Sequence, residues 1–367
     1  MKIDLEKIDL ENFMVHPHFI GDHEVVLVQP VHIGARWRKD TMIFRSSVWD
    51  MEGNPVSLSF KKFFNYGEQP ALAPIPPSLH GAELLEKLDG STLLFSRYKG
   101  HTVIRTRGTV DARKQENGYE IDYLIQKYPK FMAYLESVQD TEYTYAVEWL
   151  SPTNRIVISY GVEPDMVLTG AMKHEDYSYA SQTFLDEFAA QYELKRPKRY
   201  AYDSIDEMKS AVEAFVGVEG LCVYHREGQE ILKVKGAHYL FLHRAKSDIA
   251  SIEKVIDLYT NYRDVLGHSP SYTEFYDYLA TSFDHEIATM ARADASRICD
   301  AMDEVEKILT GMASFVEPLK LVSRKDAAIA ITQAYGTTGR TAMCFKLLDG
   351  KLLDGDAVKK LIYQVLK

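Results

Sequence analysis

The hydrophobic pattern of this chain changes near residue 244, and that change limits the possible folds more than any other feature. From about residue 24 to residue 243, short β-branched and aromatic runs alternate with turn residues, which is typical of strands. Helical spacing interrupts these runs at Ile121–Val138, Thr183–Tyr192 and Ile205–Phe215. After about Arg244, apolar residues recur at helical spacing. We therefore predict an α+β domain over residues 1–243 and an all-α domain over residues 244–367.

Within the first domain, the β-branched runs predict strands over residues 24–28, 91–96, 155–160 and 230–234. The segment Pro70–Pro77 holds four prolines in eight residues. Since proline donates no backbone hydrogen bond, this segment can neither pair in a sheet nor continue a helix. It is predicted to be a loop that leads into the segment with the most specific chemistry.

Composition and charge narrow the class of protein. With 367 residues, of which 46% are hydrophobic and 26% charged, the chain suits two globular domains. The formal net charge of −10 argues against a protein that coats nucleic acid through its overall charge, but a local basic groove remains compatible with it. Cationic residues do cluster in pairs, at Lys61 and Lys62, Arg97 and Lys99, Arg105 and Arg107, and Lys233 and Lys235.

Other function classes are disfavoured by what the sequence lacks. There is no run of eighteen apolar residues, and charges occupy the N-terminal positions where a signal peptide is apolar. We therefore expect a cytoplasmic protein with no membrane contact. The three cysteines, Cys222, Cys299 and Cys344, are far apart and form no CxxC pair, which argues against a disulfide framework or a cysteine zinc site.

The segment Lys87-Leu88-Asp89-Gly90 has the form KxDG, in which a lysine amine can attack the α-phosphate of a nucleotide. By itself it could equally be a turn between strands with an exposed lysine. Further segments follow in order: a strand over residues 143–149 that contains Glu148, then Glu219, then Lys233 and Lys235. Residues two apart in a strand share a face, so both lysines can address one phosphate. The alternative for this last pair is the solvated face of an edge strand.

Together these segments resemble motifs I, III, IV and V of the covalent nucleotidyltransferases, which include DNA ligases, RNA ligases and mRNA capping enzymes. Upstream, Arg45 and Lys62-Phe63-Phe64-Asn65 resemble the segment of RNA ligases that precedes the nucleophile. The nearest similarity is to the RNA ligase 1 family of tailed bacteriophages, the tRNA-repair ligases. It covers about residues 40–245, and the helical remainder agrees only in length and type. The resemblance implies an ATP-grasp-like nucleotidyltransferase domain of antiparallel sheets with flanking helices.

The resemblance also implies a reaction in three steps. Lys87 attacks the α-phosphate of ATP, AMP passes to an RNA 5′-phosphate, and an RNA 3′-hydroxyl then displaces AMP. ATP and Mg²⁺ or Mn²⁺ are the implied cofactors, and RNA with 5′-phosphate and 3′-hydroxyl ends, nicked tRNA included, is the implied partner of a monomer. If the chain is phage-encoded, it acts in the host cytoplasm. Because a lysine must lose a proton before it attacks, we expect Lys233, Lys235 and the metal ion to lower the pKa of Lys87.

Site residues follow from the resemblance position by position. The catalytic set is Lys87, Asp89, Lys233 and Lys235, and the metal set is Asp89, Glu148 and Glu219. The nucleotide-binding set is Arg45, Lys62, Glu86, Gly90, Arg107, Glu148, Glu219, Lys233, Lys235 and Tyr239. Gly90 is expected to let the backbone approach the nucleotide closely. Two positions depart from the family pattern: Ser46 stands where a glycine is expected, and Arg107 stands where the phage family has a lysine.

Two other functions remain open. A DNA ligase or a capping enzyme would typically place an all-β oligonucleotide-binding domain after motif V, whereas helices are predicted here. A non-catalytic RNA-binding module would be expected to lack at least one of the motif residues.

Two segments also have two explanations each. The basic run Lys195–Arg199 could bind RNA phosphates or be a solvated linker, and the tyrosines between Tyr259 and Tyr278 could stack on RNA bases or pack helices together.

Overall fold

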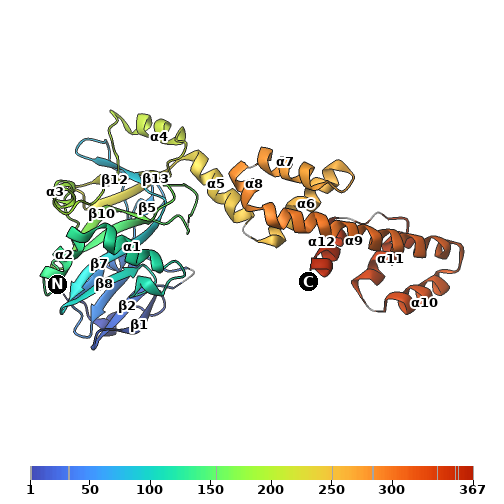
Figure 1. Ribbon diagram of the computed structural model, residues 1–367, viewed down its shortest axis with the longest axis horizontal. Coiled ribbons are helices and arrows are strands. Elements are labelled where there is room, and N and C mark those ends of the chain that lie inside the picture. The colour runs from blue at the N-terminus through green and yellow to red at the C-terminus, as the bar shows by residue number, and fades with distance from the viewer. Residues whose placement is uncertain are drawn as a thin grey trace. The chain divides into compact units, whose positions relative to one another are not determined.

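The structure is a computed structural model that describes residues 2–31, 34–153, 155–249, 251–282, 285–336, 338–351, 353 and 355–366. The chain divides into two compact units, residues 1–240 and 241–367. The first unit is α+β and the second is helical in its described residues (Figure 1). This confirms the predicted fold class. The predicted domain boundary at residue 244 lies inside helix α5 (Ala237–Asp248), which begins seven residues earlier.

Among the described residues, the strands of the first unit form three sheets. The N-terminal sheet has the order β1-β2-β3-β4 and consists of β1 (Phe13–Ile20), β2 (His23–Pro30), β3 (Ser47–Asp50) and β4 (Pro55–Leu58). The second has the order β10-β9-β7-β8 and consists of β7 (Ser91–Tyr98), β8 (His101–Thr106), β9 (Tyr143–Leu150) and β10 (Asp165–Lys173). Both are antiparallel throughout.

The third sheet carries most of the predicted motifs. Its order is β11-β6-β12-β13-β5, with β5 (Phe64–Asn65), β6 (Glu83–Lys87), β11 (Arg199–Tyr200), β12 (Gly220–His225) and β13 (Glu230–Lys235). All of its pairs are antiparallel except β13 with β5. Strand β13 therefore lies between two partners and is not the edge strand that was one explanation of its lysine pair.

Helices cover the sheets of the first unit and build the second unit. Those of the first are α1 (Tyr119–Lys127), α2 (Pro129–Ser137), α3 (Gln182–Tyr192) and α4 (Ile205–Glu213), with short 3-10 helices at Leu5–Lys7, Met42–Arg45 and Ala112–Lys114. After α5 come α6 (Ile252–Leu266), α7 (Tyr272–Ser282), α8 (His285–Met290), α9 (Arg292–Val316), a 3-10 helix at Glu317–Leu321, α10 (Arg324–Tyr335), α11 (Gly339–Leu348) and α12 (Gly355–Leu366).

Two predicted elements differ in the structure. The helix predicted over Ile121–Val138 is interrupted at Tyr128, which has a φ of −121° and a ψ of 58°, so that α1 ends before Pro129 and α2 begins there. The cause is Pro129, which disfavours a helical conformation in the preceding residue. The strand predicted over residues 155–160 is wrong, because this segment forms no ladder and its backbone contacts the side chain of Asp89 instead. The proline segment 70–77 is a loop, as predicted.

Each sheet buries its apolar face in a hydrophobic core. Helices α1, α2 and α3 pack on the sheet that contains β7 and β9, around the rings of Phe131, Tyr145 and Phe188. Helix α4 packs on the sheet that contains β12 and β13, through Met208 and Val212. Helix α4 thus packs on the sheet that carries three residues of the site at strand ends, Lys87, Gly220 and Lys235.

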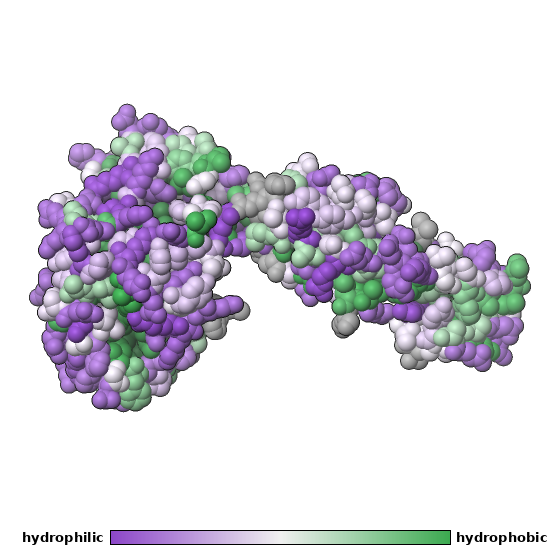
Figure 2. Space-filling view, viewed as in Figure 1, coloured by the Kyte–Doolittle hydropathy of each residue, from purple (hydrophilic) through white to green (hydrophobic). Residues whose placement is uncertain are grey.

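The second unit has a core of its own. Tyr259 is fully buried, and Tyr262 stacks on Tyr278 with ring centroids 4.2 Å apart. Packing between helices therefore explains these three tyrosines. Figure 2 shows that the visible surface of the first unit is mostly hydrophilic, with hydrophobic residues in small separate patches. None of the described helices has the length and apolar character needed to cross a membrane.

Candidate active site

Strand register brings two predicted site lysines to either side of one glycine. In the order β6-β12-β13, Gly220 pairs with Lys87 of β6 on one side and with Lys235 of β13 on the other. Glu219, the residue before Gly220, is only 2% exposed and reaches both lysines. Its Oε2 accepts a hydrogen bond from Lys87 Nζ at 2.8 Å, and its Oε1 lies 2.9 Å from Lys235 Nζ. Residues more than a hundred positions apart thus form one charged cluster.

Gly220 is a site residue that the motif comparison did not assign. Its φ is +153°, a backbone conformation that residues with side chains rarely adopt. A Cβ at this position would lie 2.0 Å from the carbonyl oxygen of Val234 on β13. Only glycine lets β12 approach β13 closely enough for Glu219 to reach both lysines. The Glu-Gly order at positions 219 and 220 is the sequence signal that could have identified it.

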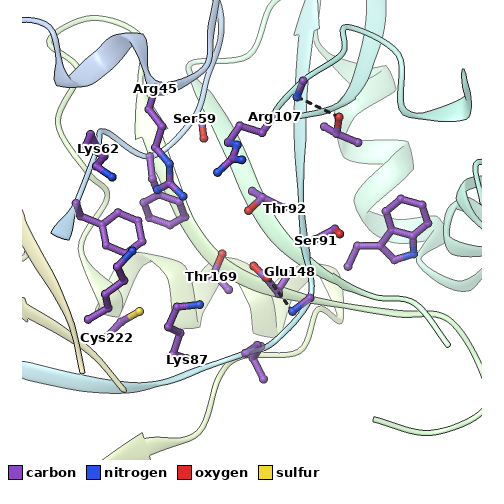
Figure 3. Close-up of a pocket in the computed structure, with 18 of the residues that line it drawn as sticks. Arg45, Ser59, Lys62, Lys87, Ser91, Thr92, Arg107, Glu148, Thr169 and Cys222 are labelled. Atoms are coloured by element: carbon purple, nitrogen blue, oxygen red, sulfur yellow. Dashed lines mark hydrogen bonds between the residues drawn. The ribbon is translucent and has the colours of Figure 1, made fainter. Parts of the chain in front are cut away.

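A cavity of about 930 Å³ opens beside Lys87. Figure 3 shows Arg45, Lys62, Lys87 and Arg107 directed into a common space, with Glu148 facing the same space. Lys233 and Lys235 also line it. The cavity thus combines a lysine at a strand end with cations from the 3-10 helix Met42–Arg45, the loop before β5, the end of β8 and strand β13.

Three of the cations, Arg45, Lys62 and Lys233, lie against aromatic rings, whereas Lys87 and Lys235 pair with Glu219. The guanidinium of Arg45 lies 4.8 Å from the ring centroid of Phe63, and Lys233 Nζ lies 5.5 Å from the same centroid. Burial and then the charge of Arg45 lower the pKa of Lys233 to about 8. Burial and then the charge of Arg107 lower the pKa of Arg45 to about 10. Such mutual repulsion favours an anion in the cavity. Phe63 belongs to the recognised motif, but its role as a platform emerges only in three dimensions.

The pKa of Lys87 is raised rather than lowered for the residues as they lie here. Burial lowers the pKa of Lys87, but the negative charges around it, chiefly Glu219, outweigh burial and hold this pKa above its usual value. Strand pairing places the Glu219 carboxylate against the amine at hydrogen-bonding distance. It is Lys233 rather than Lys87 whose pKa is depressed.

Glu148 faces the cavity from strand β9. Its Oε1 accepts a hydrogen bond from the backbone N–H of Gly90 at 3.1 Å. Burial raises the pKa of Glu148 to about 7, although the positive charge of Lys87 opposes this. A Cβ on Gly90 would lie 2.5 Å from the carbonyl oxygen of Trp149, the next residue of β9. Gly90 is therefore required for close contact with β9, which is a different reason from the nucleotide approach that the sequence suggested.

Asp89 turns away from the cavity. Its Oδ1 accepts a hydrogen bond from the Tyr239 hydroxyl at 2.7 Å, and its Oδ2 accepts from the backbone N–H groups of Val157 and Ile158 at 2.7 and 2.8 Å. Tyr239 and Asp89 are both buried. The contact with Tyr239 joins the loop after Lys87 to helix α5, and the contacts with Val157 and Ile158 explain why residues 155–160 do not form a strand.

The structure does not gather the predicted metal set. Among the described residues, no group of three His, Cys, Asp or Glu side chains could hold a metal ion. Asp89 is bound by N–H and hydroxyl groups, and Glu219 is paired with two lysines. Glu148 is the member of the set that faces the cavity.

Ser46 takes a structural role at the position where the family pattern has glycine. Its φ of −177° is ordinary extended backbone, so no glycine is required. Its hydroxyl donates to the carbonyl oxygen of Arg107 at 2.7 Å and accepts from Arg105 Nη1 at 2.7 Å. Arg105 is fully buried and also donates to Ser57. This network anchors the backbone of Arg107 at the cavity wall.

Two remaining predictions concern the chain near residue 198. Glu86 lines the cavity, its backbone N–H donates to the carbonyl oxygen of Lys198 at 2.8 Å, and burial raises the pKa of its carboxyl group.

In the basic run, Lys195 pairs with Asp165, while Arg196 and Arg199 both pair with Asp186. Three cations of this run thus pair with the chain's own carboxylates, while the side chains of Lys195 and Arg199 stay solvated, with exposed fractions of 60% and 49%.

Comparison with known proteins identifies relatives for more than half of the chain. The model of a family described as RNA ligase matches residues 48–249. A putative bifunctional polynucleotide kinase/RNA ligase of Autographa californica nuclear polyhedrosis virus is 26% identical over 224 residues, which are 56% of this chain and 31% of that protein. A putative RNA ligase of Thermovibrio ammonificans is 26% identical over 219 residues, 58% of this chain and 56% of that protein. The chain thus covers less than two thirds of either relative.

Solved structures with similar chain paths include three ligases. An archaeal ATP-dependent RNA ligase has 12% identity and a TM-score of 0.43, with 93% of this chain and 94% of that chain covered. A putative ATP-dependent DNA ligase from Aquifex aeolicus has 13% identity and a TM-score of 0.42, with 92% and 96% covered. The RNA ligase of Naegleria gruberi with PPi has 15% identity and a TM-score of 0.38, with 44% and 51% covered.

Proposed function

Since the chain belongs to the RNA ligase family, we propose that it is an ATP-dependent RNA ligase that carries AMP covalently on Lys87. In this proposal it joins a 5′-phosphate RNA end to a 3′-hydroxyl RNA end in three phosphoryl transfers. The position of Lys87 carries the proposal: its amine shares one cavity with five other cationic side chains and contacts a buried carboxylate. An amine beside such a set of cations suits attack on the α-phosphate of ATP.

In the first transfer, Lys87 Nζ forms a bond to the α-phosphorus and pyrophosphate leaves. The amine must lose a proton first, because only a neutral amine has a lone pair with which to attack. The negative charge of Glu219 opposes this loss, since it raises the pKa of Lys87. Glu219 Oε2, at 2.8 Å, is the acceptor within reach, and Lys235 holds the other oxygen of the same carboxylate. A triphosphate that engages Lys235 would release the Glu219 carboxylate from that lysine and so strengthen it as the proton acceptor.

The cations divide by position. Lys233 and Lys235 lie on the strand that flanks Glu219, and we assign them to the α-phosphate. Arg45, Lys62 and Arg107 enter from other elements and are assigned to the outer phosphates. Fixed positive groups in a partly buried cavity stabilise the charge of an in-line transfer without moving. A phosphate beside Lys233 would raise its pKa from about 8 and keep it charged.

The donor groups fit a divalent metal ion at one carboxylate rather than at three. Glu148 faces the cavity, and because burial raises its pKa to about 7, a nearby cation would stabilise its ionised form. Magnesium or manganese bound there with the ATP phosphates would neutralise phosphate charge during transfer. Asp89 and Glu219 already have partners, so we assign Asp89 to positioning the loop after Lys87 and Glu219 to proton transfer.

The wider role is also a proposal. We assign three further residues to the nucleoside end of ATP because each lies next to a residue already placed. Glu86 precedes Lys87, Gly90 contacts Glu148, and Tyr239 contacts Asp89. We assign RNA selection to the helical unit, with nicked tRNA as one substrate in RNA repair. The protein would act as a monomer in the cytoplasm, that of the host if it is phage-encoded.

Labelling with ATP that carries a radioactive α-phosphate tests the central step. The protein is incubated with the nucleotide and Mg²⁺, denatured and examined for label on the chain. We expect label on the wild-type chain and none on Lys87→Ala. Persistent label on Lys87→Ala, or no label on a folded wild-type protein, would reject Lys87 as the carrier of AMP.

Two comparisons then separate the alternatives. Labelling by GTP in place of ATP would indicate a capping-type enzyme. Sealing of nicked duplex DNA in preference to single-stranded RNA with a 5′-phosphate would indicate a DNA ligase. A non-catalytic RNA-binding module would bind RNA but take up no label with either nucleotide.

A further inference from the structure

The cavity beside Lys87 continues past the basic residues into a region we call the far lobe, formed by Met14, Gln29, Pro30, Val31 and Trp37. Strand pairing brings two of these residues together, because Met14 lies opposite Gln29. Trp37 is anchored to the same strand pair, since its ring packs edge-on against that of Phe13 on β1 with centroids 5.5 Å apart. The far lobe therefore stands on the β1–β2 pair rather than on the sheet that carries Lys87.

Lys62 borders the far lobe on its basic side. Its Nζ lies 5.7 Å from the centroid of the Trp37 ring and 5.0 Å from that of Phe64. Lys62 is one of the cations assigned to the outer phosphates. A ligand that extends beyond the phosphate next to Lys62 would therefore enter the far lobe.

The far lobe differs in chemistry from the rest of the cavity. None of its five residues is charged; they offer an indole ring, a thioether, two small apolar groups and one amide. Aromatic faces stack on nucleobases, and amides form hydrogen bonds with base edges. These groups suit a nucleoside rather than a third phosphate.

The order of the transfers identifies which nucleoside this is. Both of the first two transfers occur at the same phosphorus, and Lys87 Nζ is the entering group in one and the leaving group in the other. An in-line displacement requires entering and leaving groups on opposite sides of the phosphorus. The RNA 5′-phosphate must therefore enter from the position that pyrophosphate vacated, next to Arg45, Lys62 and Arg107.

In the second transfer, one bond to the phosphorus forms and one breaks. An oxygen of the RNA 5′-phosphate forms the new P–O bond, and the P–N bond to Lys87 breaks. The electron pair of that bond returns to Nζ, which takes up a proton. The product is AMP joined to the RNA through a 5′–5′ diphosphate, with the RNA nucleoside on the side of Lys62 that faces the far lobe.

We infer that the far lobe binds the 5′-terminal nucleoside of the RNA strand that carries the 5′-phosphate, with its base stacked on Trp37. This inference rests on the proposed function and adds the site of the second substrate. The same cavity then serves ATP and RNA in succession, through a shared phosphate region between two different nucleoside regions.

The test compares two RNAs with a 5′-phosphate and a blocked 3′ end, identical except that one lacks its 5′-terminal base. Lysyl-AMP protein is isolated first, so that the measurement excludes any effect of the substitution on the reaction with ATP. Transfer of AMP to subsaturating RNA is then followed in a single turnover. For the wild type, removal of the base should slow transfer roughly tenfold, the loss of one stacked base. In Trp37→Ala the two RNAs should differ less than about twofold, whereas Trp37→Phe should keep most of the difference.

Controls keep each outcome decisive. Tyr119 is 65% exposed and does not line the cavity, so Tyr119→Ala should retain the full dependence on the base. If Trp37→Ala does not fold, Gln29→Ala tests the same lobe and should also reduce the dependence. Equal transfer to both RNAs by the wild type, or full dependence in Trp37→Ala, would overturn the inference alone. Absence of lysyl-AMP in the wild type would instead reject the proposed function, and the inference with it.

Discussion

Glu219 accepts a hydrogen bond from Lys87 at 2.8 Å although 131 residues separate them in sequence, and the same carboxylate contacts Lys235. This ion pair keeps Lys87 in its charged form and places a proton acceptor against the group that must lose a proton. Glu219, which we assign to take the proton from Lys87, is thus also the residue that raises the pKa of Lys87.

Glu219→Gln should move the pH dependence of self-labelling. The charge of Glu219 is the main group that raises the pKa of Lys87, so its removal lowers that pKa and the labelling rate should begin to rise at a lower pH. At the low end of the pH range, where the amine is still protonated, the rate should fall roughly a hundredfold, since the proton acceptor is lost. Initial labelling rates between pH 6 and pH 10 measure both effects. Glu136→Gln, at an exposed position of α2 that does not line the cavity, is the charge-matched control, and a Glu219→Gln profile that coincides with it would contradict this assignment.

Glu148→Gln should raise the free energy of unfolding while it lowers the rate of self-labelling. The folded-state pKa of Glu148, about 7, exceeds the reference value of 4.5, so the contribution of this group to stability is full below pH 4.5 and is lost as the pH rises through 7. A glutamine stays neutral, and because the side chain is partly exposed we expect a gain of about 2 kcal/mol at pH 8. The gain should shrink as the pH falls towards 4.5. Urea unfolding without divalent metal measures it, and a gain independent of pH would refute the explanation.

The same Glu148→Gln protein tests the metal assignment. Self-labelling should fall at least about tenfold, since an amide oxygen binds a divalent ion more weakly than a carboxylate. Removal of metal with EDTA should abolish labelling of the wild type, and either Mg²⁺ or Mn²⁺ should restore it. A variant that labels as fast as the wild type at limiting Mg²⁺ would exclude Glu148 from metal binding.

Gly220→Ala should disrupt the site and the sheet together. The new Cβ would lie 2.0 Å from the Val234 carbonyl oxygen at a φ of +153°, so we expect a loss of about 3 kcal/mol or more and no detectable labelling. Gly228→Ala is the matched control in the β12–β13 hairpin, with a φ of +79° but no atom within 4 Å of the new Cβ. It should cost about 1 kcal/mol. Equal losses in the two variants would show that backbone conformation alone accounts for the effect.

Tyr239→Phe should weaken the link between helix α5 and the loop after Lys87. It removes the hydroxyl that donates to Asp89 at 2.7 Å, and loss of a buried hydrogen bond to a carboxylate costs about 1.5–3 kcal/mol. Urea unfolding followed by tryptophan fluorescence reports on the first unit, because Trp37, Trp49 and Trp149 all belong to it. Tyr119→Phe, at an exposed position, should change stability by less than about 0.5 kcal/mol. If both variants behave alike, the hydroxyl of Tyr239 does not stabilise the fold.

The sequence predicted those features that depend on local spacing. The β-branched runs predicted β7 and β13, helical periodicity predicted α3 and α4, and Pro129 could have indicated the break between α1 and α2. Of the site residues that the family motifs predicted, Arg45, Lys62 and Glu148 are among those that line the cavity, whereas Asp89 and Glu219 are not. Residues 155–160 were mistaken for a strand because their β-branched composition is compatible with a strand, whereas their backbone N–H groups are taken by Asp89.

What the sequence determined by itself is the kind of chemistry available: a KxDG lysine, ordered carboxylates and a lysine pair at strand spacing. What only the tertiary structure decided is how these groups affect one another. Strand order sets Lys87 and Lys235 on either side of Gly220, and this makes Glu219 the partner of both and raises the pKa of Lys87. It also turns Asp89 inward to Tyr239. Coulomb energies and hydrogen bonds depend on distances of a few ångströms, and distances between residues far apart in sequence are fixed by sheet register and core packing rather than by any local pattern.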